Sequence, residues 1–214
     1  MAVALLVAAG SGERLGADRA KAFVALGGKP MFQWSLEAID AAGIEEVVIA
    51  MPREMTVVSA AGALTVPGGE VRSASVRNAF EASDGDPVVV HDAARPLASA
   101  DLFRRVLAEL EASGADGAIA AAPVPDTVKR ARGGEVVETL DRSQLWAVQT
   151  PQAFRRDALD RALDVSDDVL AAATDDAWLV ERAGGRVRVV EGPPENFKVT
   201  TPHDLRRAEE LLGC

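Results

Sequence analysis

The sequence predicts an α/β fold in which a mostly parallel central sheet is flanked by helices. Short runs of apolar and β-branched residues alternate along the chain with longer stretches of helical character, as in proteins built from α/β units. The 214 residues, 48% of them hydrophobic, are enough for one domain with a proper core and few for two. No repeat, low-complexity tract or linker interrupts the sequence. We therefore expect residues 1–214 to form a single domain.

The first half of the chain contains signals for four strands and two helices. The apolar run at residues 2–8 indicates a buried strand, and further strands are expected at 44–51, 64–66 and 87–91. Pro30 can open a helix because its fixed φ suits the first turn, and Gly43 can end that helix after Ala42. A second helix is expected at 73–82.

The second half repeats the pattern. Ser99 is a suitable N-cap for a helix that reaches about Ala112, and a strand is expected at 116–124. A helix at 175–183, a strand at 186–191 and a last helix from about Pro202 complete the prediction.

The segment from Asp126 to Gln149 interrupts this alternation. Two β-prone runs flank the pair Gly133-Gly134, which is typical of a hairpin turn. A hairpin inserted into an α/β sheet either covers a site or reaches another subunit. An ordinary hairpin at the edge of the sheet explains the pattern equally well.

Charge and cysteine content exclude several classes of protein. The net charge of −10 argues against a nucleic-acid partner and against binding to an anionic membrane. The only cysteine is Cys214, so no disulfide can form within the chain, which suits a reducing compartment. The apolar run at the start is too short to span a membrane, and no basic segment precedes it as in a signal peptide. We expect a cytoplasmic protein.

The first strand runs into the loop VAAGSGERLG, residues 7–16. Ligands of open α/β sheets bind at the carboxyl ends of strands, and small residues let an anion approach backbone N–H groups. Gly10 and Gly12 fit the dinucleotide motif G-x-G-x-x-G, but Leu15 replaces its third glycine, and the Walker P-loop motif is absent. On the glycines alone, a structural turn is as good an explanation as a binding loop.

Cations in and after this loop favour phosphate binding. Arg14 and Lys21 lie seven residues apart in an acidic protein, and together with backbone amides they suit a triphosphate. Two solvated surface cations are the alternative. A second polar cluster ends the strand in VVVHDAARP, residues 88–96. There Asp92 can bind a divalent metal and Arg95 a phosphate, whereas His91 suits packing or hydrogen bonding better than general-base catalysis.

Several separated motifs together resemble the 2-C-methyl-D-erythritol 4-phosphate cytidylyltransferase family almost from end to end. The resemblance is carried, in order, by VAAGSGERLG with Lys21, GGEVRSASV (68–76), VHDAARP (90–96), APVPDTVKR (122–130), LDRSQLWAVQTPQAF (140–154), TDDA (174–177) and EGPPENFKVTTPHDL (191–205). Two motifs depart from the family pattern. Ala20-Lys21-Ala22 replaces the usual P-K-Q, which removes a glutamine contact, and the usual T-D-E-A has Asp176 in place of its glutamate.

The resemblance implies a single Rossmann-like nucleotidyltransferase domain with a protruding β-hairpin arm at residues 124–149. It implies that a cytidylyl group passes from CTP to 2-C-methyl-D-erythritol 4-phosphate with Mg²⁺ as cofactor, in non-mevalonate isoprenoid biosynthesis. It also implies a homodimer in which the arm reaches the neighbour's site.

The resemblance assigns roles to fourteen residues by position. The nucleotide is expected to contact Ala8, Ala9, Gly10, Gly12, Gly69 and Ser75. The reacting phosphates are expected to lie among Arg14, Lys21 and Lys198, and Asp92 to bind the metal. The sugar phosphate is expected to contact Arg95, Thr127, Arg142 and Thr174, of which Thr127 and Arg142 lie in the arm.

Three other functions remain open from the sequence. A ribitol 5-phosphate cytidylyltransferase is closely related, although its glycine loop more often reads L-A-G-G than A-A-G. A nicotinamide-dependent dehydrogenase would need the third glycine that Leu15 replaces. An inactive nucleotide-binding scaffold should have lost its reactive residues, yet Arg14, Lys21, Asp92 and Lys198 are all present.

Overall fold

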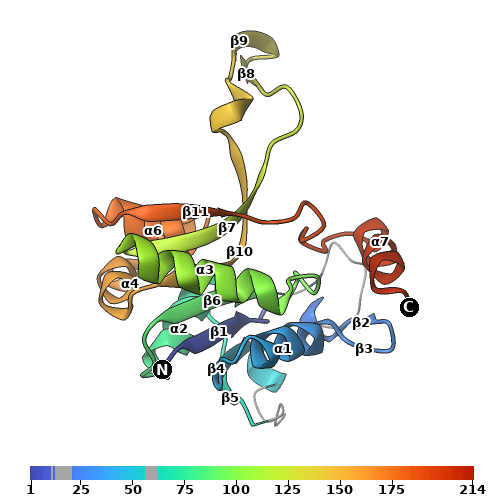
Figure 1. Ribbon diagram of the computed structural model, residues 1–214, viewed down its shortest axis with the longest axis vertical. Coiled ribbons are helices and arrows are strands. Elements are labelled where there is room, and N and C mark those ends of the chain that lie inside the picture. The colour runs from blue at the N-terminus through green and yellow to red at the C-terminus, as the bar shows by residue number, and fades with distance from the viewer. Residues whose placement is uncertain (11, 13–20, 56–61) are drawn as a thin grey trace.

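The computed structural model describes residues 1–10, 12, 21–55 and 62–214, and its described strands build one main sheet (Figure 1). This sheet has seven strands in the order β11-β7-β10-β6-β1-β4-β5. Their bounds are β1 Val3–Val7, β4 Glu46–Met51, β5 Leu64–Pro67, β6 Val88–Asp92, β7 Gly117–Pro123, β10 Trp146–Phe154 and β11 Val187–Glu191.

All neighbouring pairs in this sheet are parallel except the two that β10 makes, with β6 and with β7. The mostly parallel sheet expected from the sequence is therefore confirmed. In the register, Val7 at the end of β1 lies opposite Asp92 at the end of β6. The glycine loop and the VHDAARP segment thus leave the sheet at the same edge.

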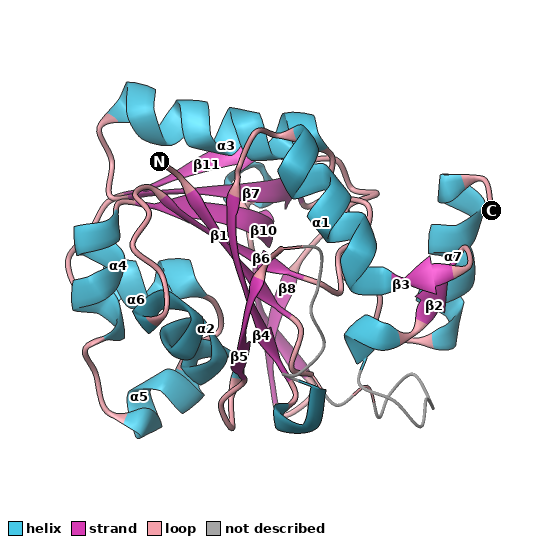
Figure 2. Ribbon diagram, turned by 90° about the horizontal axis from the view of Figure 1, so that it is seen from below, coloured by secondary structure: helices cyan, strands magenta, loops and turns pink. Residues whose placement is uncertain are grey.

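Helices cover both faces of the sheet, as Figure 2 shows. Helices α1 (Met31–Ala41) and α3 (Ala100–Ser113) pack on one face, and α2 (Arg72–Glu81), α4 (Arg156–Leu163), α5 (Asp167–Ala172) and α6 (Asp176–Arg182) on the other. Alternate side chains of β1 enter the two resulting cores: Val3 and Leu5 point to one, and Ala4 to the other. A strand with both faces buried needs apolar residues throughout, which explains the run at its position.

The helix caps and element bounds predicted from local sequence agree with the structure. The Ser99 side chain accepts a hydrogen bond from Leu102 N and caps α3. Each expected strand and helix is present with its ends shifted by one or two residues. The sequence did not indicate α4, α5 or β10 as elements. Pro151 lies inside β10, where a proline argues against a strand, and a shift of register between Val148 and Gln152 accommodates it.

A small unit lies beside the main body. The strands β2 (Ala25–Leu26) and β3 (Lys29–Pro30) form a hairpin next to the last helix, α7 (Pro202–Leu212). An apolar cluster joins them, with Leu26, Met31, Val199 and Ala208 at its buried centre. Two short 3₁₀ helices, η2 (Lys21–Phe23) and η3 (Arg53–Met55), precede and follow the α1–β4 region.

The segment that broke the α/β alternation projects from the sheet as an arm (Figure 1). Strands β8 (Lys129–Arg132) and β9 (Glu135–Thr139) form the predicted hairpin, and the 3₁₀ helix η4 (Arg142–Gln144) leads back to β10. Gly133 and Gly134 have φ of +58° and +86°, a left-handed backbone conformation that favours glycine in a two-residue hairpin turn. The arm exposes large apolar side chains, Val136 and Val137, in an acidic protein.

Candidate active site

Two cavities open at the edge of the sheet where β1 and β6 end. The glycine-loop cavity has a volume of about 400 Å³ and is lined by residues that follow β1 and precede α2. The α6 cavity has a volume of about 460 Å³ and is lined by residues of β10, of α6 and of the segment before α6. Three residues line both cavities: Arg72, Asp92 and Lys198. This shared group is called the junction below.

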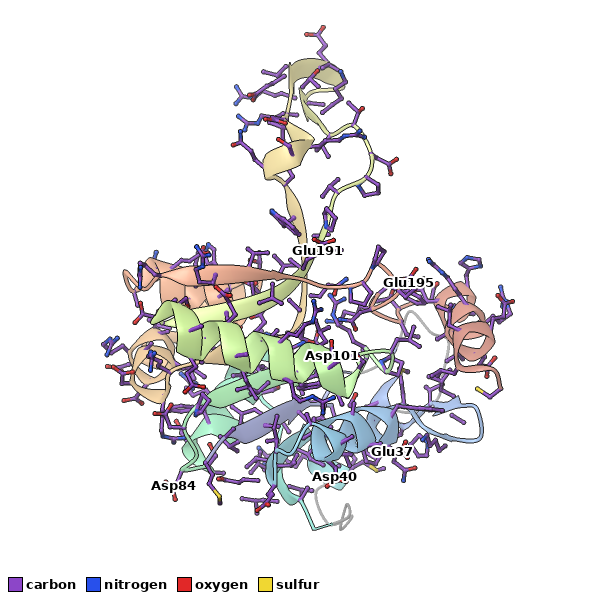
Figure 3. The ribbon with its side chains drawn as sticks, in the orientation of Figure 1. Glu37, Asp40, Asp84, Asp101, Glu191 and Glu195 are labelled. Carbon is purple, nitrogen blue, oxygen red and sulfur yellow. The ribbon has the colours of Figure 1, made fainter. Side chains whose placement is uncertain are left out.

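Charge is distributed unevenly over the molecule. Exposed carboxylates lie on separate elements of the body, including the labelled Glu37, Asp40, Asp84, Asp101, Glu191 and Glu195 of Figure 3. The two cavities contain cations and acids together: their linings include Arg72, Arg95 and Lys198 as well as Glu70, Asp92, Asp175 and Glu181. Three cations thus gather at this edge of the sheet beside the acids, and each of them can face an anionic ligand.

The glycine-loop cavity brings together five of the six residues expected to contact a nucleotide. Its lining includes Ala8, Ala9, Gly10, Gly69 and Ser75. The sixth, Gly12, has φ of +79° and does not line it. The backbone N–H of Gly69 donates to Ser75 Oγ over 3.0 Å, so the side chain fixes the turn before α2.

Small residues keep this turn close to the glycine loop. A Cβ at Gly68 would lie 2.2 Å from the Cβ of Ala9, which is too close for any side chain. A Cβ at Gly69 would likewise lie 2.5 Å from the Cβ of Ala74 in α2. The glycines are therefore required by close packing around the cavity.

Asp92 is the centre of the junction. Its Oδ1 accepts a hydrogen bond from Arg72 Nε over 2.8 Å, and its Oδ2 accepts one from Lys198 Nζ over 2.6 Å. Burial alone would raise the pKa of this carboxyl, but the charges of Arg72 and Lys198 hold it well below the usual range. Asp92 is therefore a permanent anion at neutral pH.

Asp176 supports Arg72 from the side away from the cavities. Arg72 Nη1 donates to Asp176 Oδ2 over 2.7 Å, and the Asp176 side chain is fully buried. Burial raises the pKa of Asp176 above its usual value, although the charge of Arg72 opposes this. Burial alone would lower the pKa of the Arg72 guanidinium. The carboxylates of Asp176 and Asp92 outweigh this effect and raise that pKa above its usual value.

His91 supports the backbone and does not reach a cavity. Its Nδ1 lies 2.9 Å from Thr150 Oγ1 and its Nε2 lies 3.3 Å from the carbonyl oxygen of Arg95. Burial lowers the pKa of His91 to about 4, so the ring is neutral at pH 7. Thr150 Oγ1 in turn accepts from the N–H of Asp92 over 3.0 Å. These contacts fix the backbone of Asp92, the central residue of the junction.

The α6 cavity contains two of the residues expected to contact a sugar phosphate. Thr174 and Arg95 line it, together with the polar side chains of Gln149 and Gln152 from β10. Arg95 is committed to the protein backbone: its Nη1 donates to the carbonyl oxygen of Asn196 over 2.7 Å, and its Nη2 to that of Val148 over 3.2 Å. Arg95 therefore links β10 to the segment that carries Lys198.

The remaining expected residues lie elsewhere. Arg14 lies outside the described residues, and so does the side chain of Lys21, whose backbone begins η2. Thr127 and Arg142 belong to the arm, are exposed, and line neither cavity of their own chain. Arg142 Nη1 donates to the carbonyl oxygen of Pro125, within the arm.

Sequence reasoning did not single out Arg72 or Asp176 as site residues. Arg72 lies inside the GGEVRSASV motif, and Asp176 inside TDDA, so both were part of the pattern that carried the resemblance. Their pairing joins positions 104 residues apart, and nothing local in either motif indicates the partner.

The junction offers one carboxylate to a metal ion. Among the described residues, no group of three or more His, Cys, Asp or Glu side chains could hold a metal. Mg²⁺ needs no such group, because it is commonly held by one or two carboxylates together with substrate phosphates and water. A single permanently ionised carboxylate that lines both cavities fits that mode of binding.

The comparison with known proteins agrees with this geometry. A family model described as 2-C-methyl-D-erythritol 4-phosphate cytidylyltransferase matches residues 2–213. The chain is 45% identical over 223 residues to the protein of that name from Rubrobacter xylanophilus, with 100% of this chain and 95% of that protein covered. It is 44% identical over 210 residues to the protein of that name from Deinococcus radiodurans, with 98% and 89% covered.

A solved structure shares the fold over the whole chain. The crystal structure of 2-C-methyl-D-erythritol 4-phosphate cytidylyltransferase from Thermus thermophilus matches with a TM-score of 0.85 and 35% sequence identity, and each chain is covered to 100%. The single α/β domain, its sheet and its flanking helices are thus those of a known architecture.

Proposed function

This chain belongs to the 2-C-methyl-D-erythritol 4-phosphate cytidylyltransferase family, and we infer from this that it is a nucleotidyltransferase. It moves a cytidylyl group from CTP to 2-C-methyl-D-erythritol 4-phosphate. The products are 4-diphosphocytidyl-2-C-methyl-D-erythritol and pyrophosphate, in the non-mevalonate route to isoprenoids. The structural observation that supports this assignment is the junction, where the glycine-loop cavity and the α6 cavity share the charged side chains Arg72, Asp92 and Lys198.

The reaction requires two anions to be held in line. An oxygen of the acceptor's phosphate attacks the α-phosphorus of CTP, and the bond from that phosphorus to the pyrophosphate oxygen breaks. A phosphate monoester has its second pKa near 6, so the acceptor is a dianion at neutral pH and needs no general base. The neutral, buried His91 agrees with this chemistry. The protein contributes orientation and charge stabilisation.

Fixed cations supply that stabilisation. Lys198 lies at the junction and can contact the phosphates from both cavities. We assign Arg14 and Lys21 to the triphosphate and the α-phosphate on the basis of sequence. Charges aimed at the phosphorus that reacts lower the energy of the transition state more than that of the bound substrate.

We propose that Asp92 holds Mg²⁺ together with phosphate oxygens of CTP. The ion would offset the negative charge that develops on the leaving pyrophosphate. The chain's own part is to keep one ionised carboxylate at the junction, which Arg72 and Lys198 ensure by their charge.

We propose further that two chains pair through the arm, residues 124–149, and that Arg142 and Thr127 of each arm contact the acceptor in the other chain's α6 cavity. Both residues are exposed and line neither cavity of their own chain, and the arm exposes Val136 and Val137, which a partner could cover. The planar guanidinium of Arg142 suits a phosphate.

Subunit complementation tests the shared site. An inactive Lys198→Ala protein and an inactive Arg142→Ala protein are mixed and allowed to exchange subunits. A mixed dimer then has one site with both defects and one with neither, so we expect activity to reappear. If exchange is confirmed by mass and no activity returns, each chain builds its site alone.

Pyrophosphate release tests the reaction itself. The four nucleoside triphosphates are crossed with methylerythritol phosphate, ribitol 5-phosphate and glucose 1-phosphate. We expect release only with CTP and methylerythritol phosphate. Preference for ribitol 5-phosphate would instead support the related cytidylyltransferase, and binding of NAD in place of CTP would support a dehydrogenase.

The cytoplasmic location stays a prediction from the sequence. No described helix is long and apolar enough to cross a membrane.

A further inference from the structure

Arg72 joins two acids that come from distant parts of the chain. It is the first residue of α2, and its guanidinium donates through Nε to Asp92 at the end of β6 and through Nη1 to Asp176 at the start of α6. The distances are 2.8 Å and 2.7 Å. Arg72 and Asp92 line both cavities, whereas Asp176 lines neither. The hydrogen bond to Arg72 is therefore the direct contact through which Asp176 reaches the junction.

The arrangement is not what stability alone would favour. Asp176 is fully buried, and among the described residues neither its Oδ1 nor Arg72 Nη2 has a hydrogen-bond partner. Taking charged groups out of water costs several kcal/mol each, and a well-packed apolar group of the same size is often at least as stable. Unpaired buried atoms add to that cost. A role in the site explains why the chain carries such a pair where a packed apolar contact would serve the fold.

The two oxygens of Asp92 have different partners. Arg72 holds Oδ1, while Oδ2 contacts Lys198, whose side chain is the most exposed of the three. A ligand that enters either cavity can take the place of Lys198 at Oδ2, but it cannot readily displace Arg72, because Asp176 anchors that side chain on its other side. The guanidinium suits this task, since its planar fork donates along two directions at once.

We propose that Arg72, anchored by Asp176, is a positioning residue that holds Asp92 by Oδ1 and so presents Oδ2 to ligands at the junction. Asp176 acts indirectly: it fixes Arg72, which in turn holds Asp92. The inference rests on the proposed function, because it takes the ligand at Oδ2 to be CTP with its metal ion.

A double-mutant cycle on CTP binding tests whether Arg72 acts through Asp92. Binding is measured by equilibrium titration without acceptor, so that no turnover is required, with and without Mg²⁺. We expect Arg72→Met and Asp92→Asn each to weaken binding in Mg²⁺ by about tenfold, and the double variant by about tenfold as well, not a hundredfold. Additive losses would overturn the inference, since they would show that Arg72 contacts the nucleotide independently.

A second cycle tests the anchor. Asp176→Asn should weaken CTP binding in Mg²⁺ by a few-fold in the otherwise unchanged protein and have no further effect when Arg72 is already methionine. A purely structural role predicts instead that Asp176→Asn lowers the melting temperature equally in both backgrounds and leaves binding by the folded protein unchanged. That outcome would also overturn the inference.

The matched control lies on the same helix. Arg77 Nη2 pairs with Asp167 over 2.8 Å, away from both cavities, so Arg77→Met removes an ion pair of α2 without touching the junction. It should leave CTP binding unchanged. If Arg72→Met does not fold, Arg72→Lys takes its place, because an ammonium lacks the planar fork that holds Asp92 and Asp176 in fixed directions. It should show the same non-additivity with Asp92→Asn.

The outcomes separate this inference from the function on which it rests. Unaltered protein that binds CTP no better with Mg²⁺ than without would contradict the metal assignment in the proposed function. If CTP binding by the unaltered protein does depend on Mg²⁺, additive losses in the cycles measured with Mg²⁺ contradict only the role of Arg72.

Discussion

Lys198 Nζ lies 2.6 Å from Asp92 Oδ2, although the two residues are 106 positions apart. Lys198 comes from the segment between β11 and α7, and the next residue, Val199, donates its N–H to the carbonyl oxygen of Ala94 over 2.8 Å. The backbone after β6 thus holds the segment that carries the lysine. The cation and the anion that we propose to act in the same reaction are thereby held next to each other by the fold.

Lys198→Ala should lower kcat by about 10²–10³ while the protein stays folded, because a fixed cation matters most as charge moves in the transition state. Steady-state rates of pyrophosphate release measure this. The matched control is Lys29→Ala: Lys29 pairs with Glu37 on the surface and lines neither cavity. A comparable loss in both variants would show that the effect is not specific to the junction.

Asp92→Asn should remove most Mg²⁺-dependent turnover, since it keeps the shape of the side chain but removes the charge of the proposed metal ligand. The rate is measured over a range of Mg²⁺ concentrations, with the melting temperature as a check on the fold. Asp84→Asn, which changes an exposed acid far from the junction, should behave like the unaltered protein. If Asp92→Asn is as active as the unaltered protein at the same Mg²⁺ concentration, Asp92 does not bind the metal.

Gly10→Ala should weaken CTP binding without destabilising the fold. A Cβ at Gly10 meets no heavy atom of the described residues within 4 Å, and Gly10 lines the glycine-loop cavity. The methyl group would therefore occupy space that we expect the nucleotide to need. We expect KM for CTP to rise by about tenfold or more, and thermal unfolding to be unchanged. A destabilised protein with normal affinity would mean that the glycine serves the turn and not the ligand.

Asp204→Asn should lower the free energy of unfolding by about 1 kcal/mol at neutral pH, because it neutralises the acid of the capping box that Asp204 forms with the N-cap residue Thr201. Asp204 Oδ2 accepts from Thr200 N, Thr200 Oγ1 and Thr201 N, each over 2.8 Å, at the start of α7. Burial alone would raise the pKa of Asp204, but these bonds lower it to about 2 from an ordinary 3.8.

The sign of the pH dependence follows from that shift. Because the folded protein holds the proton of Asp204 more weakly than the unfolded chain, the stabilisation is complete above about pH 4 and is lost as the pH falls through about 2. The difference between Asp204→Asn and the unaltered protein should therefore shrink over that range. Urea unfolding at several pH values measures it, and Asp101→Asn, which changes an exposed residue of α3, is the control. A difference that does not depend on pH would exclude the ionised cap.

Several parts of the fold could be predicted from local sequence alone. The buried strand β1 follows from an apolar run, because both faces of a central strand are covered. The cap at Ser99 and the turn at Gly133-Gly134 follow from residue types that suit those conformations. β10 could not be predicted in this way. Its pairing with β6 and β7 is non-local, and Pro151 within it signals the opposite.

The candidate site, like the fold, was predicted from the sequence only in part. The sequence by itself determined the family, the loop with Ala8, Ala9 and Gly10, and the acid that ends β6, because these lie in contiguous motifs at the ends of strands. Only the tertiary structure decided which side chains meet there. Arg72, Asp176 and Lys198 reach Asp92 or one another from three separate segments, and the packing of α2 and α6 on one face of the sheet, with the hydrogen bond from Val199 to Ala94, brings them together. Contacts between residues about a hundred positions apart depend on how elements pack, and no local pattern of residues encodes that packing by itself.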